Sequence, residues 1–336
     1  MTAPAPPTLD AGATPQVVAA PAEDGAATAP ASAARAVGLR KVFGATVAVE
    51  GIDLDVPTGS VLGMLGPNGS GKTTLIRMLL GLTRPTDGTA ELLGHPIPDE
   101  AAWALPHVGA LVEGPGFHPF LSGRENLRRG AATEPLLASR DIPGAVDAAL
   151  ERVGLAGAAD RRFRGYSLGM KQRLGLAAAL LIPRRLVVLD EPTNGLDPAG
   201  TRDVRRIIAE LHEGGATVIV SSHLLAEVEA TCTHVAVLQA GSLVAAGELH
   251  TLLDTGTGGL VVSTPDVDLA VRTLRAAGTT AYRADGADPA VVVGEDGPPA
   301  PEVIALLVRA GVAVHEARRS RANLEELFAR LTEETS

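Results

Sequence analysis

The chain has 336 residues, and its 29 basic and 39 acidic side chains give a formal net charge of −10. This acidic balance argues against binding to a nucleic-acid backbone, and an aromatic content of 2% leaves few side chains for stacking on single-stranded bases. No apolar run approaches the roughly 18 residues of a membrane-spanning helix, and the start of the chain does not resemble a signal peptide. We therefore expect a soluble chain, and any membrane span must come from another protein.

The single cysteine, Cys232, excludes an intrachain disulfide and a cysteine-based zinc site, and its apolar neighbours predict a packing role.

Three regions of different composition follow one another along the chain. Residues 1–34 are almost entirely Ala, Pro, Thr and Gly without apolar periodicity, which predicts a disordered tail. Residues 35–255 alternate strand-like and helix-like segments, as in an α/β domain with a largely parallel sheet. The turn-rich segment "DTGTGG" ends this pattern, and residues 256–336 predict a small accessory α+β domain.

Several elements of the α/β region are well marked. Residues 60–66 predict a buried strand, and the following helix carries apolar residues at positions i, i+3, i+4 and i+7, namely Leu75, Met78, Leu79 and Leu82. Ser122 and Glu125 have the spacing of a capping box, which predicts a helix start. β-branched apolar runs at 186–190 and 217–222 predict central parallel strands.

A further helix is predicted to begin after Asp197, because Pro198 follows this cap residue and Gly214 supplies a stop. Its core stripe consists of Val204, Ile207, Ile208 and Leu211.

The C-terminal region predicts the order βαββαβ of a ferredoxin-like module. The elements are a strand at 259–263, a helix at 266–277, strands at 280–284 and 289–294, a helix at 300–310 and a strand at 311–317. Asn323 with Glu326 predicts the cap of one last helix at 323–331.

The segment "GPNGSGKTT" at 66–74 matches the pattern G-x-x-x-x-G-K-[ST] between a strand and a helix. Glycines let backbone N–H groups curl around a polyphosphate, and the helix points its positive end at the same anion. Lys72 would reach the β- and γ-phosphates, and Thr73 would offer its hydroxyl to Mg²⁺. The pattern predicts a nucleotide site in preference to a flexible turn. The candidate residues are Gly66, Pro67, Asn68, Gly69, Ser70, Gly71, Lys72, Thr73 and Thr74.

Three side chains at the ends of predicted strands are candidates for the chemistry. Asp190 closes the strand "LVVLD", where an acid can meet a metal held at the first loop. Glu191 is placed to orient or deprotonate a water; the alternative is that it begins a turn before Pro192. His223 closes the strand "TVIVSSH" at the edge where ligands bind, which favours a functional over a structural histidine.

The segment "YSLGMKQRLGLAAALL" at 166–181 predicts a second anion-binding helix end, because Ser167 can cap a helix that opens with Gly169. One domain already has its phosphate loop, so this second end must serve a second molecule. A dimer with nucleotide between the two copies satisfies both loops.

With these motifs the chain resembles an ABC transporter ATPase subunit. The phosphate loop, "YSLGM", "LVVLDEP", "NGLD" and "SSH" follow the family's order over about residues 35–250. The resemblance implies a P-loop NTPase fold of the ABC ATPase type, with a mainly parallel sheet core, an antiparallel β subdomain and a helical subdomain at about 114–185. The usual signature L-S-G-G-Q is altered at Tyr166, Leu168 and Met170, while Ser167 and Gly169 are kept. This form is similar to that of bacterial drug and antibiotic exporters whose membrane subunit is a separate polypeptide.

The resemblance implies ATP and Mg²⁺ as cofactors and assigns further roles. Phe43 would stack on adenine, and Asp197 in the "NGLD" loop would belong to the nucleotide-binding residues. Lys72 and Mg²⁺ would stabilise the transferred phosphoryl group, Glu191 would polarise water, and His223 would contact the γ-phosphate.

The implied partners are a separate transmembrane permease and a second copy of the chain in a head-to-tail nucleotide sandwich, with no nucleic acid. In this dimer Ser167 and Gly169 would act on the nucleotide of the opposite subunit. The implied location is the cytoplasm, peripheral on the inner face of the cell membrane.

Glu113 lies 41 positions after Lys72, where the family usually has glutamine. The loop "ALVEGPGFHPFLSGRENL" resembles the glutamate-bearing loop of lantibiotic and bacitracin self-protection transporters. A residue at this position would face Mg²⁺ and the attacking water; the alternative is a solvent-facing loop acid. The first reading favours a peptide antibiotic or similar drug as cargo, and it leaves open whether Glu113 raises or lowers turnover.

Three other functions compete with that of an exporter ATPase. Chromosome and DNA-repair ATPases insert long coiled coils between phosphate loop and signature, whereas Lys72 and Ser167 are only 95 positions apart. Translation factors of the class need two such heads in one chain. A nucleotide-gated regulatory or assembly subunit with little turnover remains the alternative, because the signature is altered although the Asp190–Glu191 pair is intact.

Overall fold

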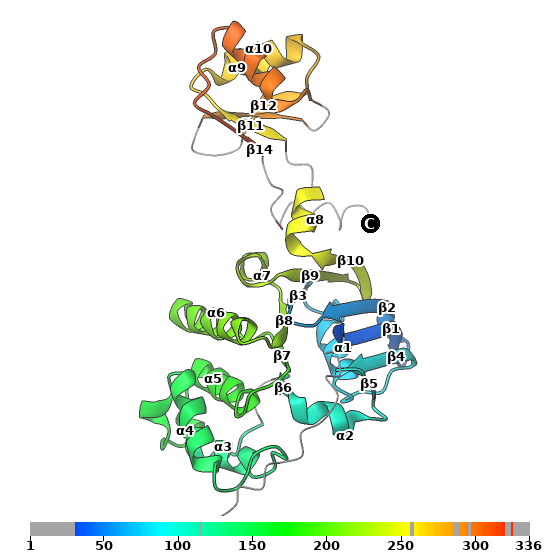
Figure 1. Ribbon diagram of the computed structural model, residues 1–336, viewed down its shortest axis with the longest axis vertical. Coiled ribbons are helices and arrows are strands. Elements are labelled where there is room, and N and C mark those ends of the chain that lie inside the picture. Colours follow the sequence, from blue (N-terminus) through cyan, green and yellow to red (C-terminus); the bar gives the residue numbers. More distant parts are fainter. Residues whose placement is uncertain are drawn as a thin grey trace, which may run out of the picture.

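The computed structural model describes residues 31–113, 116–255, 259–284, 289–294, 297–319 and Leu324. Within these ranges the strands form one six-stranded sheet and two four-stranded sheets (Figure 1). None of the helices described combines the length and the apolar character that crossing a membrane requires.

The first four-stranded sheet is antiparallel and has the order β2-β1-β4-β5. Its strands are β1 (Ser32–Phe43), β2 (Thr46–Pro57), β4 (Asp87–Leu92) and β5 (His95–Ile97). β1 begins within the segment 1–34 that the sequence assigned to the tail, because Ala33 and Ala34 pack in the core of this sheet. The rest of the predicted tail, residues 1–30, lies outside the described residues.

The six-stranded sheet has the order β10-β9-β3-β8-β7-β6. All its pairings are parallel except that of β10 with β9, which confirms the predicted α/β class. Its strands are β3 (Val61–Leu65), β6 (Val108–Leu111), β7 (Leu186–Asp190), β8 (Thr217–Ser222), β9 (His234–Gln239) and β10 (Ser242–Glu248).

The central strands separate two hydrophobic cores, because successive side chains of a strand point to opposite faces. In β7, Leu186 and Val188 pack toward the antiparallel sheet and α1 (Lys72–Leu79), whereas Val187 and Leu189 pack toward the helices of the other face. The six residues of β8 are all buried. A sheet covered on both faces explains why these strands are continuous apolar runs.

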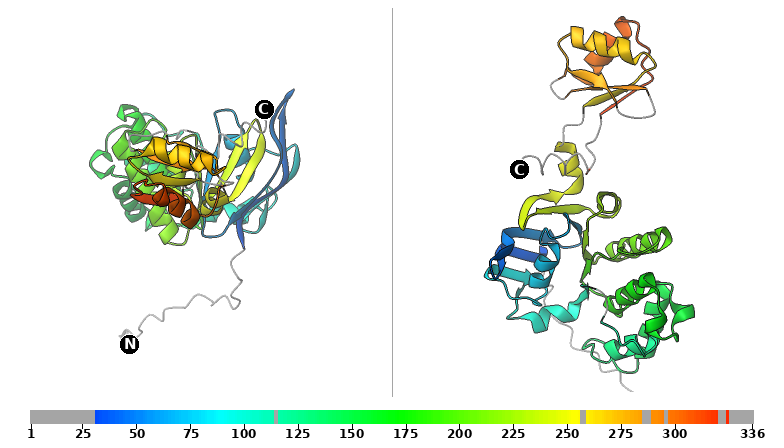
Figure 2. Two further views of the ribbon diagram at one scale, coloured as in Figure 1. Left: turned by 90° about the horizontal axis from the view of Figure 1, so that it is seen from above. Right: turned by 180° about the vertical axis from the view of Figure 1, so that it is seen from behind.

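The face opposite α1 carries α3, α4, α5 and α6 (Figures 1 and 2). These helices are α3 (Gly123–Ala131), α4 (Ile142–Arg152), α5 (Leu168–Ala179) and α6 (Pro198–Glu213). The capping box predicted for α3 is confirmed, since the Ser122 hydroxyl accepts from the Glu125 N–H and the Glu125 carboxylate accepts from the Ser122 N–H. Short helices complete this part of the chain, namely α2 (Ala101–Ala104), α7 (Leu225–Thr231) and α8 (Leu249–Thr255).

The prediction that Leu82 belongs to the core stripe of α1 is wrong. The helix ends at Leu79, and Gly81 adopts a φ of 70°, which lies outside the helical region. The Leu82 side chain follows this turn and is 65% exposed.

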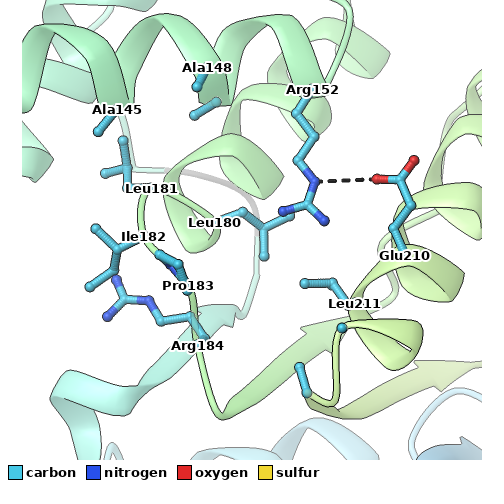
Figure 3. A pocket seen from close by; sticks show the side chains of 13 residues that line it. Ala145, Ala148, Arg152, Leu180, Leu181, Ile182, Pro183, Arg184, Glu210 and Leu211 are labelled. Atoms are coloured by element: carbon cyan, nitrogen blue, oxygen red, sulfur yellow. Dashed lines mark ion pairs between the residues drawn. The ribbon is translucent and has the colours of Figure 1, made fainter.

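A pocket of about 350 Å³ lies between α4, the segment after α5, and α6 (Figure 3). Its lining is mainly apolar, with Leu180, Leu181 and Leu211 among its residues. Arg152 of α4 and Glu210 of α6 form an ion pair with an N–O distance of 3.5 Å beside it. The ion pair thus joins two helices that are distant in sequence.

The third sheet has the order β12-β13-β11-β14 and lies beyond α8 (Figure 1). Its elements are β11 (Leu260–Ser263), α9 (Val267–Ala276), β12 (Ala281–Arg283), β13 (Ala290–Val293), α10 (Ala300–Arg309) and β14 (Glu316–Arg319). The predicted order βαββαβ is confirmed, and its strands and helices share one hydrophobic cluster that includes Val262, Val291 and Val303.

The last strand differs from the prediction of 311–317. Val312 packs in the hydrophobic cluster under α10, so the chain reaches the sheet only after this residue, and β14 spans Glu316–Arg319. The predicted last helix at 323–331 lies outside the described residues except for Leu324, which is helical and buried against the core of the six-stranded sheet.

Cys232 follows α7 and is buried, as its apolar neighbours predicted. Burial in apolar surroundings raises the pKa of its thiol from 9.0 to about 12.

We expect iodoacetamide at pH 8 to label Cys232 in the folded chain about a thousandfold more slowly than in the urea-unfolded chain, because the thiolate is the reactive form. The folded thiol keeps a proton that the unfolded chain loses between pH 9 and 12, so this group lowers stability as pH rises through that range. Equal labelling rates for folded and unfolded chain would contradict the burial.

Candidate nucleotide site

The phosphate loop connects β3 to α1, and its backbone conformation requires glycine at two positions. Gly66 and Gly71 have φ values of 155° and 103°. A Cβ atom would lie 2.3 Å from the Leu238 carbonyl oxygen at Gly66 and 2.6 Å from the Ala48 carbonyl oxygen at Gly71. Gly69 at the tip faces open space. The loop is therefore packed on its inner side and open on the side where a ligand would lie.

Lys72 lies across this loop. Its side chain is 6% exposed, and its ammonium donates to the carbonyl oxygens of Gly66 at 2.7 Å and Pro67 at 3.2 Å. The Ser70 hydroxyl is buried without a hydrogen-bond partner in the structure. A buried cation and an unpaired hydroxyl beside the start of a helix fit a phosphate group, which would accept from both.

A cavity of about 370 Å³ opens beside the loop. Its lining consists of Phe43, Thr46, Val47, Ala48, Asn68, Gly69, Ser70, Gly71, Lys72, Thr73, Thr74 and Glu191. Phe43 is 50% exposed, and the Lys41 ammonium lies 4.9 Å from its ring centroid. The cavity thus joins a flat apolar ring at one part of its wall to the candidate phosphate-binding residues of the loop at another.

Two of the three residues predicted to contact a metal, Thr73 and Asp190, contact each other. The Thr73 hydroxyl donates to Oδ2 of Asp190 at 2.8 Å, although the two residues are 117 positions apart. A hydroxyl and a carboxylate supply the hard oxygen ligands that Mg²⁺ prefers. Among the described residues no cluster of three or more His, Cys, Asp or Glu side chains could hold a metal ion. A Mg²⁺ ion held by Thr73 and Asp190 would have further coordination positions for phosphate oxygens and water, which Mg²⁺ commonly takes as ligands.

Glu191 is the point where the phosphate loop, β7 and β8 meet. Its Oε2 lies 2.8 Å from Nδ1 of His223, and its Oε1 lies 3.7 Å from the ammonium of Lys72. Its φ of 47° is unusual for a residue with a side chain. The structure therefore brings together Lys72, Glu191 and His223, three of the four side chains that the sequence proposed for the chemistry, whereas the fourth, Glu113, does not line this cavity.

Ser221 supports this arrangement and was missed by the sequence reasoning. Its buried hydroxyl donates to Oδ1 of Asp190 at 2.6 Å and accepts from the N–H of Glu191 at 2.8 Å. The only signal was a serine in an apolar strand. Strand pairing between β7 and β8 places Ser221 directly opposite Asp190.

The signature segment lies elsewhere on the chain. The Ser167 hydroxyl accepts from the Met170 N–H at 3.2 Å and caps α5, as predicted. Ser167 is exposed, and neither it nor Gly169 belongs to the lining of the phosphate-loop cavity. α5 lies on the other side of the six-stranded sheet from α1 (Figure 1).

Asp197 also lies outside the cavity lining, and its carboxylate accepts from the Gly200 N–H at 2.8 Å. This contact confirms its predicted role as the cap of α6. A single chain therefore does not bring Ser167, Gly169 or Asp197 to its own phosphate loop cavity.

Glu113 follows β6 and has a φ of 51°. Its carboxylate forms an ion pair with Arg77 in the last turn of α1, and its side chain is 61% exposed. It does not line the phosphate-loop cavity. A contact of Glu113 with Mg²⁺ or water stays a prediction.

Comparison with known proteins agrees with these features. Residues 49–194 match the ABC transporter family. The ABC transporter ATP-binding protein YdbJ of Bacillus subtilis is 38% identical over 296 residues, which are 88% of this chain and 94% of that protein. The bacitracin transport ATP-binding protein BcrA of Enterococcus faecalis is 42% identical over 212 residues, which are 61% of this chain and 66% of that protein.

A solved structure of the ATP-binding subunit of an ABC transporter superposes with a TM-score of 0.61 at 25% identity, over 67% of this chain and 93% of that one. The phosphate loop, the Thr73–Asp190 contact and the Glu191–His223 pair thus occur in a chain with full-length similarity to such subunits. The chain therefore belongs to the ABC transporter family, as one of its ATP-binding ATPase subunits.

Proposed function

We propose that the chain hydrolyses ATP with Mg²⁺ and so drives the efflux of a drug or peptide antibiotic through a separate transmembrane permease. The main support for ATP hydrolysis is that the side chains of Lys72, Glu191 and His223 lie together beside the phosphate loop. The same region of the fold supplies Thr73 and Asp190 as oxygen ligands for a divalent cation. Bound Mg²⁺ would neutralise charge on the phosphate oxygens.

The cavity beside the loop suits a nucleoside triphosphate. Phe43 offers a flat face for the base, and the phosphates would take the backbone N–H groups of the loop and of the start of α1 as donors. Lys72 would exchange its carbonyl contacts for the β- and γ-phosphates, since a charged acceptor makes the stronger hydrogen bond.

Hydrolysis needs a base near the γ-phosphate, and Glu191 is the carboxylate in this position. Lys72 and His223 both face this carboxylate. A γ-phosphate would attract both of them, which would leave the Glu191 carboxylate free to accept a proton from water or to orient it. His223 would then donate to the γ-phosphate.

A second copy of the chain would complete the site. Ser167 caps a helix whose first N–H groups are available to an anion, yet neither Ser167 nor Gly169 lines the cavity of its own chain. A head-to-tail dimer would bring both residues, together with the loop that holds Asp197, to the nucleotide of the other subunit. We assign no nucleic-acid partner.

The proposal for the cargo rests on sequence similarity to other transport proteins. BcrA, which is 42% identical over 212 residues, is named as a bacitracin transport protein, and the Glu113 loop resembles that of peptide-antibiotic transporters. The chain would then act in the cytoplasm, bound through the permease to the inner face of the cell membrane.

We also propose that residues 256–336 form an accessory domain separate from 35–255. Among the described residues, the hydrophobic cluster around β11, β13 and α10 contains only positions from Leu260 to Ala317, and the third sheet pairs only with its own strands. Leu324, which follows these elements, packs instead in the core of the six-stranded sheet.

The export function is tested by expressing the chain together with its permease in a host sensitive to peptide antibiotics. We expect the inhibitory concentration of bacitracin or a related peptide to rise, and Glu191→Gln to abolish this rise. An unchanged inhibitory concentration for a panel of peptide antibiotics and drugs, with the complex present in the membrane, would contradict the proposed cargo class.

Replacing Glu113 with glutamine tests the unusual residue at this loop position. We expect Glu113→Gln to leave ATP affinity largely unchanged and to change hydrolysis or transport by less than Glu191→Gln does. The ion pair with Arg77 is exposed, so its loss should lower the free energy of unfolding by less than about 1 kcal/mol. The measurement is transport and ATPase rate, with Glu113→Ala beside it. Wild-type transport by both variants would show that Glu113 is an ordinary loop acid.

A further inference from the structure

Glu227 in the first turn of α7 contacts both segments that carry the proposed catalytic pair. Its Oε2 accepts from the Thr193 hydroxyl at 2.7 Å and from the Ser222 hydroxyl at 3.1 Å. Thr193 lies two residues after Glu191, and Ser222 directly precedes His223. One carboxylate oxygen therefore joins the loop after β7 to the end of β8.

The contacts of Glu227 can stabilise the local backbone conformation of both segments. The φ of 47° at Glu191 lies in the left-handed region, which needs support from surrounding contacts. On the other side, the Ser222 hydroxyl gives its proton to Glu227 and accepts from the N–H of Leu224 at 3.0 Å. Ser222 thus fixes the turn that contains His223.

The surroundings of Glu227 argue against a ligand site. The cavity beside Glu227 has a volume of about 10 Å³, and its lining includes Thr193, Ser222, Arg205 and Thr231 besides apolar side chains. This space is enough for about one water molecule and for no larger ligand. An ionised carboxylate has no proton to donate, so it can accept from both hydroxyls at once.

We propose that Glu227 is a positioning residue for ATP hydrolysis, which holds the Glu191 carboxylate and the His223 ring at their separation of 2.8 Å. The proposal rests on the proposed roles of Glu191 and His223. Without Glu227 only the contacts of Ser221 and the pairing of β7 with β8 join the two segments, and these hold the strand ends but not the loop and turn beyond them. The water and the γ-phosphate then no longer meet both side chains in the required geometry. Because Glu227 does not line the phosphate-loop cavity, ATP binding does not depend on it.

The test compares steady-state ATP hydrolysis by the full chain and its variants over a range of ATP concentrations, with ATP affinity measured by a fluorescent analogue. Glu227→Ala is expected to lower kcat about 10- to 100-fold, the range for a misplaced catalytic group, with KM and affinity changed less than about twofold. The kcat of Glu227→Gln is expected to lie between those of the wild type and Glu227→Ala, since the amide oxygen of glutamine still accepts from a hydroxyl. Glu229→Ala, an exposed acid on the same helix, serves as the matched control and should match the wild type.

Thr193→Val removes one of the two hydroxyl contacts without touching α7, so it tests the same link even where Glu227→Ala folds poorly. If both residues act through one link, the double variant Thr193→Val/Glu227→Ala should be no slower than Glu227→Ala alone. A wild-type kcat for Glu227→Ala or for Thr193→Val in folded protein would overturn the positioning role. A decrease in kcat that the unfolded fraction of the variant fully accounts for would overturn it as well. Equal, near-zero rates for the wild type and Glu191→Gln would instead overturn the proposed hydrolysis and this proposal with it.

Discussion

Replacing Glu191 with glutamine is expected to lower steady-state ATP hydrolysis by about 10²- to 10⁴-fold, the usual contribution of a general base. Glutamine keeps the length of the side chain but cannot accept a proton from water. It also loses the negative charge that faces Lys72 at 3.7 Å and His223 at 2.8 Å. ATP binding should persist, because the phosphate loop and the Thr73–Asp190 contact remain.

The measurement is phosphate release by the purified chain, with nucleotide affinity determined in parallel. Glu213→Gln, at the exposed end of α6, makes the same chemical change away from the cavity and should hydrolyse ATP like the wild type. Equal and near-zero rates for the wild type and Glu191→Gln would favour the regulatory subunit with little turnover. A Glu191→Gln variant as active as a clearly active wild type would show that another group activates the water.

Replacing Arg184 with alanine is expected to lower the free energy of unfolding by about 3–5 kcal/mol, the cost of leaving one partner of a buried ion pair uncompensated. Arg184 donates to both carboxylate oxygens of Glu134, at 3.3 Å and 2.5 Å, and to the Pro106 carbonyl oxygen at 2.6 Å. The two charged side chains are only 5% and 12% exposed. Their contact joins the segment after α3 to the segments that lead into β6 and β7.

Chemical denaturation of each variant gives this difference in free energy. Arg185→Ala is the matched control, since Arg185 is the exposed neighbour, and it should change the free energy by less than about 0.5 kcal/mol. The double variant Arg184→Met/Glu134→Leu should recover most of the loss, because it leaves no buried charge without a partner. A loss below about 1 kcal/mol for Arg184→Ala would show that water or another group compensates Glu134.

Much of the nucleotide site could be predicted from sequence because its parts are contiguous. The phosphate loop lies within nine residues, and its glycines, lysine and threonine each have one role that follows from residue type and spacing. The caps at Ser122, Ser167 and Asp197 are equally local, since a capping side chain contacts an N–H only three residues away. The strands 186–190 and 217–222 were recognisable because burial on both faces requires apolar residues throughout.

The sequence could not show which polar side chains would contact one another across elements. Ser221 and Asp190 are 31 positions apart, Glu227 and Thr193 are 34 apart, and Arg184 and Glu134 are 50 apart. A serine in a strand or a glutamate in a helix has no local feature that identifies its partner. Leu82 and β14 were misplaced for a related reason: apolar periodicity does not show where a turn interrupts the element.

The sequence by itself determined the class of sheet, and it singled out the phosphate-loop segment and the candidate residues Asp190, Glu191 and His223, because residue type and local spacing specify these features. Only the tertiary structure decided that Glu191 faces both Lys72 and His223, that Glu113 pairs with Arg77, and that Ser167 stays away from its own chain's loop. The physical reason is that these contacts depend on the pairing of β7 with β8 and on the packing of helices against the sheet. Both are set by the whole hydrophobic core and not by any one segment.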